Sequence, residues 1–122
     1  MTSGGSLSIR PGKNFNKTGA FGPALVTTDM LPEGMSNARI QTRLNGVTMQ
    51  DSNTENLIFP VRRLVSILSE IMTLEPGDVV VSGTPEGVGH ARRPPVWMKS
   101  GDYVEVEIEG LGVLSNTVED ET

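Results

Sequence analysis

The alternation of apolar and polar residues predicts two β-hairpins. From position 39 the chain alternates, with Ile40, Thr42 and Leu44 on one face, and after Asn45-Gly46 it continues with Val47 and Met49. Both central residues of a type I′ turn need positive φ, which favours an Asn-Gly pair between two strands. The pattern therefore predicts one hairpin at about 38–50. Strict alternation over 103–109, a glycine-flanked turn at 110–112 and an apolar-rich run at 113–118 predict a second one.

One amphipathic helix is predicted between these hairpins, over residues 61–72. Pro60 suits its first turn, and Pro76-Gly77 lies beyond its end, where a helix breaker belongs. Most residues on one side of this helix are apolar and most on the opposite side are polar, so the apolar stripe should pack on the sheet. That stripe is Val61, Leu64, Val65, Leu68, Ile71 and Met72.

A third element is predicted directly after the helix. Val79, Val80 and Val81 form a β-branched run that is too short for a helix and is typical of a strand buried on both faces. It leads into a glycine-rich loop, SGTPEGVG, at 82–89. Gly-Asp pairs at 77–78 and 101–102 each open a predicted strand, which indicates that the same turn chemistry is used twice.

The composition fits one small, loop-rich domain that is mainly β with one α-helix. The 122 residues are 36% hydrophobic and 20% charged, which disfavours disorder over the whole length, and 14 Gly with 8 Pro predict many turns. Residues 1–23 show no helical or strand period. We therefore expect residues 1–11 to be a flexible N-terminal segment.

The charge pattern excludes some partner classes. The net charge is −5 and the basic residues are dispersed, so we expect no nucleic-acid partner. There is no cysteine, which excludes disulfides and thiolate metal sites. No apolar run approaches the ~20 residues of a membrane span, and no signal-peptide pattern is present, so we expect no membrane partner and a cytoplasmic location.

Few residues stand out as candidates for chemistry. His90 is the single histidine and, without a nucleophile elbow, is interpreted as a surface residue. Glu105, Glu107 and Glu109 could suggest a metal site, but alternation places them on the solvated face of a strand. The 82–89 loop is equally compatible with a tight structural turn and with a functional loop that offers the Thr84 hydroxyl.

Five segments together resemble the C-terminal part of the fumarylacetoacetate hydrolase family. Their order and approximate spacing carry the resemblance, which covers nearly the whole chain after Arg10 and is closest to 2-hydroxyhepta-2,4-diene-1,7-dioate or 5-carboxymethyl-2-hydroxymuconate isomerase-like members. The segments are GKNFNKTGAFGP (12–23), LVTTDML (25–31), TRLNGVTMQDSNT (42–54), LSEIMTLEPGDVVVSGTPEGVG (68–89) and PPVWMKSGDYVEVEIEGLGVLSNTVEDE (94–121).

The resemblance implies a fold and an activity. The fold is a mixed β-roll or β-sandwich, here N-terminally incomplete, with residues 12–122 as the C-terminal part of the catalytic domain. The activity is that of a hydrolase, isomerase or decarboxylase of aromatic catabolism, acting on small oxo- or hydroxy-dicarboxylic acids of the acylpyruvate or hydroxymuconate type through a metal-stabilised enolate. The family uses Mg²⁺ or Mn²⁺, and a homodimer is expected.

The resemblance also assigns site residues. Lys13 matches the lysine of the family's G-K-x-F motif and would stabilise the enolate, a catalytic and substrate-binding role. Thr84 matches the threonine of the G-T-P motif, which binds the substrate carboxylate, and Gly83 would let the backbone approach it. The family's E-x-E metal ligands lie upstream of G-K-x-F, and none of the twelve residues before Lys13 is acidic. Asn16 also stands where many members have Asp.

Two hypotheses therefore follow. In the first, the chain is part of a metal-dependent enzyme and is inactive alone because it contains no metal ligand. In the second, it is a non-catalytic β-roll module for binding or dimerisation. Equilibrium metal binding discriminates between them.

Overall fold

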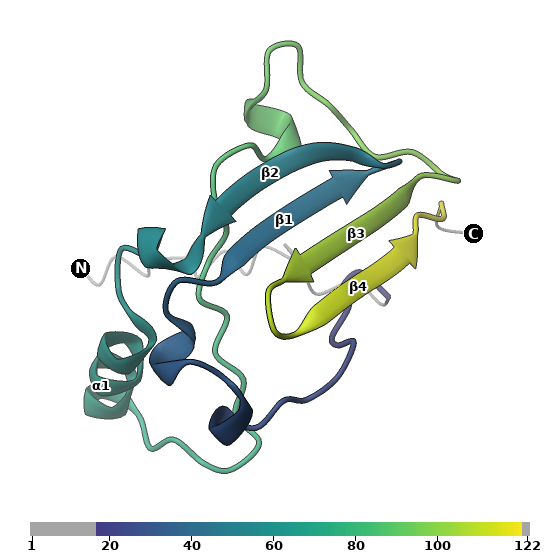
Figure 1. Cartoon of the computed structure of the whole chain (residues 1–122). Helices are drawn as coiled ribbons and strands as arrows, with labels where there is room; N and C mark the ends of the chain where they lie inside the picture. The colour runs from purple at the N-terminus through teal and green to yellow at the C-terminus, as the bar shows by residue number, and fades with distance from the viewer. Residues whose placement is uncertain (1–16, 121–122) are drawn as a thin grey trace, which may run out of the picture.

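A four-stranded antiparallel sheet is the main element of the structure. The computed structural model describes residues 17–120. The strands are β1 (Arg39–Leu44), β2 (Val47–Asn53), β3 (Tyr103–Ile108) and β4 (Gly112–Thr117), in the order β2-β1-β3-β4 (Figure 1). The single α-helix, α1, spans Val61–Ile71, and short 3-10 helices occupy Thr28–Met30 (η1), Glu33–Met35 (η2), Thr54–Asn56 (η3) and Gly89–Ala91 (η4). The predicted class, mainly β with one α-helix, is confirmed.

Both predicted hairpins are present. Asn45 and Gly46 take φ values of 50° and 80°, as a type I′ turn requires. The two hairpins join through β1 and β3, where Ile40 faces Ile108 and Leu44 faces Val104. Pairing of these two strands makes one continuous sheet out of two local hairpins.

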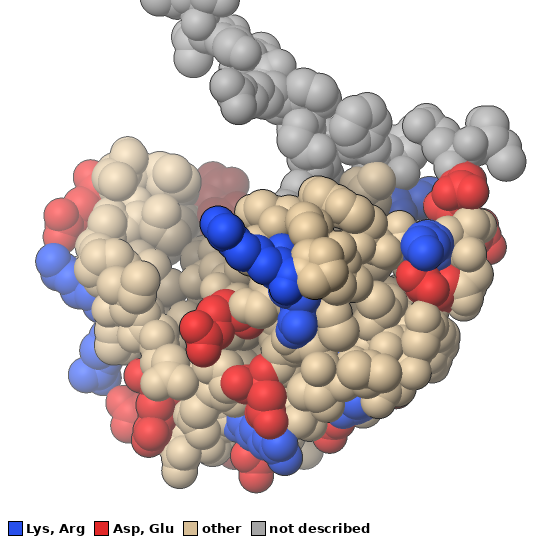
Figure 2. Space-filling model, turned by 90° about the horizontal axis from the view of Figure 1, so that it is seen from above, with Lys and Arg blue, Asp and Glu red and all other residues tan. Residues whose placement is uncertain are grey.

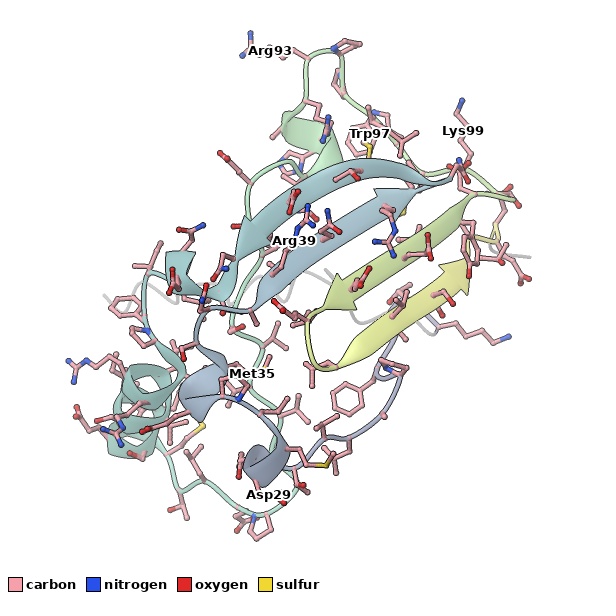
Figure 3. The ribbon with its side chains drawn as sticks, viewed as in Figure 1. Asp29, Met35, Arg39, Arg93, Trp97 and Lys99 are labelled. Carbon is pink, nitrogen blue, oxygen red and sulfur yellow. The ribbon has the colours of Figure 1, made fainter. Side chains whose placement is uncertain are left out.

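The two faces of the sheet differ in chemistry. Alternation along β1 and β3 places Arg39, Gln41 and Arg43 beside Glu105 and Glu107 on one face. The labelled Arg39 lies over this polar face in Figure 3. The other face carries the aliphatic side chains, which are Ile40, Leu44, Val104, Val106, Ile108 and Leu114.

A β-bulge interrupts the pairing of β1 and β2. Thr42 pairs with Gln50, whereas the next residue, Arg43, pairs with Thr48. Met49 is therefore an extra residue on β2 without a partner in the register. Bulges bend a strand and redirect the side chains beside them, and this one lies next to the loop that contains Thr84.

Helix α1 forms where predicted, but its predicted packing on the sheet is wrong. The element that α1 chiefly contacts is η2, and Arg62 forms an exposed ion pair with Glu33 of η2 at 3.3 Å. No residue of α1 is fully buried, and Val65 is 44% exposed. The apolar stripe predicts the helix correctly, but its covering surface must come from a tertiary contact that periodicity does not specify.

The predicted buried strand at 79–81 is also wrong. Val79, Val80 and Val81 are 61%, 43% and 87% exposed, and they belong to no strand of the described sheet. Figure 1 shows the segment between α1 and η4 passing behind the sheet rather than joining it. A β-branched run becomes a strand only when a neighbouring strand accepts and donates its backbone hydrogen bonds. None of the described strands does so.

Burial within residues 17–120 is shallow. Ala38, at 3% exposure, is the one hydrophobic residue in the buried class there. In the described part of the chain, no helix is long and apolar enough to cross a membrane. The predicted N-terminal segment, 1–11, lies outside the described residues.

Candidate functional site

The loop that contains Thr84 lies against the bulged part of β2. Gly83 takes a φ of 107°, a conformation that glycine adopts without strain. The Thr84 side chain accepts a hydrogen bond from Gln50 Nε2, with 3.2 Å between the two atoms. Both Gly83 and Thr84 are exposed. These two predicted residues, which are neighbours in the sequence, are thus exposed, and the Thr84 hydroxyl lies against Gln50.

Thr84 and Gly83 line a pocket of about 550 Å³, which we call the Thr84 pocket. Hydroxyl and amide side chains stand beside aliphatic and aromatic ones in its wall, and Glu86 is the charged residue among those described. A cation for an anionic ligand would have to come from elsewhere. The remaining lining residues are Ile40, Ser52, Asn53, Thr54, Asn56, Leu57, Ile58, Phe59, Leu64, Ser82, Pro85 and Ile108.

Two side chains that the sequence did not single out hold this loop. Gln50 Nε2 also donates to the carbonyl oxygens of Pro85 at 2.7 Å and Glu86 at 3.2 Å. Arg92 donates from Nε to the Gly87 carbonyl at 3.1 Å and from Nη2 to the Met49 carbonyl. No period or motif indicated either residue, because the bulge at Met49 is a property of strand pairing rather than of the alternation.

The E-x-E glutamates lie on the polar face of the sheet, as predicted, and they are bound by arginine. Arg43 donates to Glu107 at 2.7 Å and to Glu105 at 3.3 Å, and these hydrogen bonds hold the pKa of Arg43 above its usual value. Nearby, Arg39 binds Asp51 at 2.6 Å and holds the pKa of that carboxyl below its usual value. This face is therefore an ion-paired surface.

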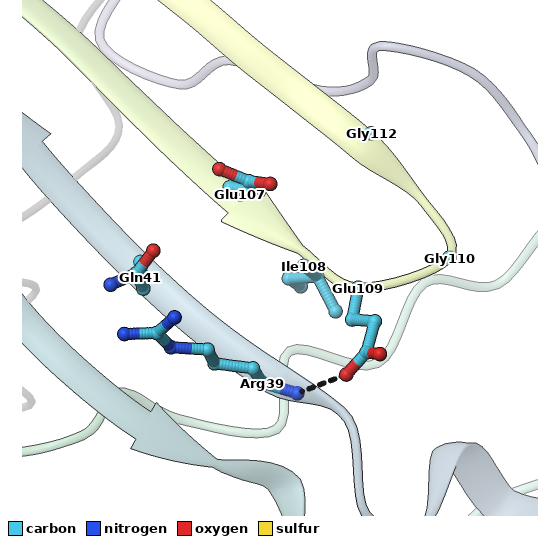
Figure 4. Close-up of a pocket in the computed structure, with 7 residues that line it drawn as sticks. All are labelled: Arg39, Gln41, Glu107, Ile108, Glu109, Gly110 and Gly112. Atoms are coloured by element: carbon cyan, nitrogen blue, oxygen red, sulfur yellow. Dashed lines mark hydrogen bonds between the residues drawn. The ribbon is translucent and has the colours of Figure 1, made fainter.

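A second pocket, of about 430 Å³, lies at one end of the polar face (Figure 4). It is lined by Arg39, Gln41, Glu107, Ile108, Glu109, Gly110 and Gly112. The Glu109 carboxylate accepts a hydrogen bond from the Arg39 backbone N–H at 3.2 Å, which Figure 4 draws. The charged side chains of this pocket are therefore all engaged, Arg39 with Asp51, Glu107 with Arg43 and Glu109 with a backbone N–H.

These carboxylates do not fit the divalent ion that the family resemblance implies. Mg²⁺ and Mn²⁺ require several oxygen ligands around one point. Within residues 17–120 no group of three or more His, Cys, Asp or Glu side chains is placed to hold an ion. The Glu105 and Glu107 carboxylates are instead occupied by the Arg43 guanidinium. We therefore derive no chemical step through a metal at these residues.

The single histidine lies at the surface. His90 is exposed within η4, which agrees with the predicted surface position. Figure 2 shows acidic and basic side chains interspersed over the upper side of the molecule, without a continuous patch of either sign. Lys13 and Asn16 lie outside the described residues, so the structure does not place the predicted lysine relative to Thr84.

Comparison with known proteins identifies the family of this chain. Residues 3–119 match the family described as "Fumarylacetoacetate (FAA) hydrolase C-terminal". The chain therefore belongs to the fumarylacetoacetate hydrolase family. A curated relative, the Bos taurus protein "Oxaloacetate tautomerase FAHD2A, mitochondrial", is 47% identical over 107 residues, which are 88% of this chain and 34% of the relative.

Solved structures support the same fold. The fumarylacetoacetate hydrolase of Exiguobacterium antarcticum matches with a TM-score of 0.78 and 40% identity, over 83% of this chain and 36% of that one. The 5-carboxymethyl-2-hydroxymuconate delta-isomerase of Mycobacterium smegmatis matches with a TM-score of 0.62 and 41% identity, over 70% and 32%. The fumarylpyruvate hydrolase of Pseudomonas aeruginosa, solved with Mn²⁺ and pyruvate, has a TM-score of 0.63 and 39% identity, over 70% and 34%.

The match is extensive for this chain but partial for its relatives. The chain spans about a third of the length of the curated relative and of the solved structures. The family, its fold and the use of Mn²⁺ by structural neighbours, all expected from the sequence resemblance, are confirmed.

Proposed function

We propose that the catalytic domain to which this chain corresponds acts on a small oxo- or hydroxy-dicarboxylic acid of the acylpyruvate or hydroxymuconate type. The chain contributes the part that binds the substrate carboxylate. Two relatives support this class of substrate: the bovine protein is named a tautomerase of oxaloacetate, and the Pseudomonas hydrolase was solved with pyruvate. Hydrolysis, isomerisation and decarboxylation of such acids share an enolate.

The exposed Thr84 hydroxyl beside Gly83 is the observation that carries the proposal. A carboxylate accepts hydrogen bonds, and a hydroxyl can donate one. The space beside the Gly83 backbone is open, because a Cβ there would meet nothing within 4 Å. In this proposal Thr84 binds the carboxylate in the Thr84 pocket, with Gly83 giving access to the backbone.

Lys13 has the complementary role in this proposal. Its ammonium would balance the negative charge that develops on an enolate oxygen, and such electrostatic groups typically contribute about 10²–10³ in rate. The described residues of the Thr84 pocket contain no cationic side chain. In this proposal Lys13 therefore supplies the positive charge that faces the anionic substrate. We expect the chain on its own to bind a small oxo-acid weakly and not to turn it over.

The substrate role of Thr84 can be tested by titrating residues 1–122 with pyruvate and following backbone amide shifts by NMR. We expect millimolar binding with shifts at Gly83 and Thr84, and at least about a threefold loss of affinity in Thr84→Val, which removes one hydrogen bond. Thr48→Val, an exposed change on the same strand as Gln50, is the matched control. Equal affinity in Thr84→Val and Thr48→Val would exclude Thr84 as the carboxylate group.

Exposed apolar residues favour a second function, a non-catalytic β-roll module for binding or dimerisation. Ile58 and Val81 are 88% and 87% exposed, and β2 and β4 are edge strands of the sheet. Such surfaces are typical of protein contacts. The pyruvate titration separates the two functions, because binding that depends on Thr84 is expected of the enzyme part and not of the module.

A further inference from the structure

Gln50 contacts three acceptor atoms of the loop that contains Thr84. Its single Nε2 atom lies 2.7 Å from the Pro85 carbonyl oxygen and 3.2 Å from both the Glu86 carbonyl oxygen and Thr84 Oγ1. Two of these three partners are carbonyls, which can only accept, so a donor must face them. The amide nitrogen, and not the amide oxygen, therefore points into the loop.

The bulge in β2 makes this contact with the loop possible. Because Met49 has no partner in the register of β1, its carbonyl accepts from Arg92 Nη2 instead. Arg92 Nε binds the Gly87 carbonyl, so the loop is held at Gly87 by Arg92 and at 84–86 by Gln50. Gly87 allows the approach, since a Cβ there would stand 2.6 Å from the Met49 carbonyl oxygen.

The contact with Gln50 also determines how Thr84 can bond. A threonine hydroxyl has one hydrogen and two acceptor sites. The two hydrogens of Gln50 Nε2 are shared among three acceptors. When one acceptor site of the hydroxyl takes part in this sharing, the hydroxyl hydrogen is directed away from Gln50 and is left to donate. The side chain is then oriented as a donor toward an acceptor-only ligand, which is what a carboxylate is.

We propose that Gln50 is a positioning residue: together with the Met49 bulge and Arg92, it fixes loop 83–87 on β2 and presents the Thr84 hydroxyl as a hydrogen-bond donor to the ligand. This inference deepens the proposed function and rests on it for the identity of the ligand. The fixed loop itself is a property of the chain that can be measured without any ligand.

The test uses residues 1–122 and the variant Gln50→Met, which keeps the length of the side chain and removes the donor. Backbone ¹⁵N order parameters report ps–ns motion, with values near 0.85 for rigid and below about 0.6 for flexible backbone. We expect residues 83–87 to be rigid in the parent chain and to fall toward the flexible range in Gln50→Met, while β1 and β3 stay rigid. Thr48→Val, an exposed change on the same strand but outside the Thr84 pocket, is the matched control and should leave the loop rigid.

Two results overturn the proposal: an unchanged loop in Gln50→Met, or an equal loss of order throughout the sheet, which would make Gln50 merely structural. If Gln50→Met does not fold, Gly87→Ala tests the same attachment from the loop side. Its control is Gly77→Ala, because Gly77 has the same φ of 99° but open space around it. A loop of equal order in these two glycine variants also overturns the proposal.

The pyruvate titration then separates the positioning role from the proposed function. In Gln50→Met the affinity measured at Thr84 should fall by roughly tenfold, because several hydrogen bonds of the site are lost together, while the melting temperature stays close to that of Thr48→Val. Unchanged pyruvate affinity in a loosened loop contradicts the positioning role. Absence of pyruvate binding in the parent chain contradicts the proposed function, and the order parameters still decide whether Gln50 fixes the loop.

Discussion

Single polar side chains link, by hydrogen bonds, segments that lie far apart in the sequence of this chain. Thr54 Oγ1 accepts from the Ala38 N–H at 2.9 Å and donates to the Met35 carbonyl at 2.5 Å. Asn45, in the turn of the first hairpin, donates to the Asp102 carboxylate at 2.9 Å and accepts from the Tyr103 N–H at 2.8 Å. Each residue thus links segments that are separated along the sequence, in a molecule with shallow burial.

Replacing Thr54 with Val should be costly. The valine keeps the shape but leaves the Ala38 N–H and the Met35 carbonyl without this partner, and a buried polar group in that state costs about 1–3 kcal/mol. Ala38 is the most buried hydrophobic residue described. Urea denaturation measures the effect against Thr48→Val, an exposed change expected to cost less than about 0.5 kcal/mol. Similar losses in both variants would contradict this account of Thr54.

Asp102 should make the fold sensitive to acid. Hydrogen bonds from Asn45, and then from the Lys99 N–H, hold the pKa of Asp102 below its ordinary value of 3.8. A carboxyl whose folded-state pKa is lowered contributes stability above the unfolded-state pKa, and this contribution is lost as pH falls through the folded-state value. The Asp102 contribution is therefore full at neutral pH, begins to fall near the unfolded-state pKa of about 3.9 and is lost as pH drops through the lower folded-state pKa.

Melting temperatures between pH 2.5 and pH 6 check this prediction. Asp102→Asn should be less stable than the parent chain at pH 6, and the difference should shrink at the acid end. Glu70→Gln, an exposed change on α1, is the control and should track the parent chain at every pH. A constant gap between Asp102→Asn and the parent chain would show that the charge of Asp102 is not responsible.

At the scale of elements, two turns with the same hydrogen bond are followed by different structures. The Glu75 N–H donates to the Asp78 carboxylate, and the Lys99 N–H donates to the Asp102 carboxylate, each at 2.8 Å. Gly77 and Gly101 both take positive φ, at 99° and 89°. The second turn opens β3, which pairs with β1 and β4, whereas the first leads into Val79–Val81, which has no strand partner among the described residues.

This contrast explains what the sequence could and could not predict. Turns, hairpins and the helix depend on local φ preferences and periodicity, so Asn45-Gly46 and residues 61–71 were predicted closely. Burial of Val79–Val81 and the packing of α1 depend on which surface lies opposite, and that is a tertiary property. The contact of Gln50 with the loop is likewise a tertiary property, so the sequence did not indicate Gln50. Thr84 and Gly83 were found through a motif, and their roles stay predictions.

The partial exposure of α1 changes the expected effect of a mutation within it. Leu68 is only half-buried, so Leu68→Ala should cost about 1 kcal/mol, below the ~2–5 kcal/mol of a fully buried leucine. Urea denaturation with Ser69→Ala as the surface control measures this. A loss above about 2 kcal/mol would show that α1 packs more tightly in solution than the structure indicates.

As a whole molecule, the chain exposes an apolar surface and spans about a third of its relatives. Val81, Ile58 and Phe59 are 87%, 88% and 49% exposed. Large exposed apolar side chains favour protein contacts when they gather on one surface, and their number here supports the homodimer as a proposal. The cytoplasmic location stays a prediction.

Self-association follows from this surface. We expect sedimentation to show a species heavier than a monomer at tens of micromolar, because exposed aliphatic side chains lose water on contact. Val81→Asp should weaken this self-association, whereas Glu119→Gln, an exposed change outside these apolar residues, should not. A monomer at all concentrations would contradict the proposed dimer.

The central claim is that this chain carries the carboxylate-binding side of the proposed oxo-acid enzyme, without a metal site among its described residues. The most direct test is to purify residues 1–122, add oxaloacetate with Mg²⁺ or Mn²⁺, and follow the enol absorbance beside a Lys13→Ala control. The account predicts no metal-dependent turnover by either protein, since losing one electrostatic donor already costs about 10²–10³ in rate and an absent metal site should cost more. Turnover that needs the metal and disappears in Lys13→Ala would contradict it.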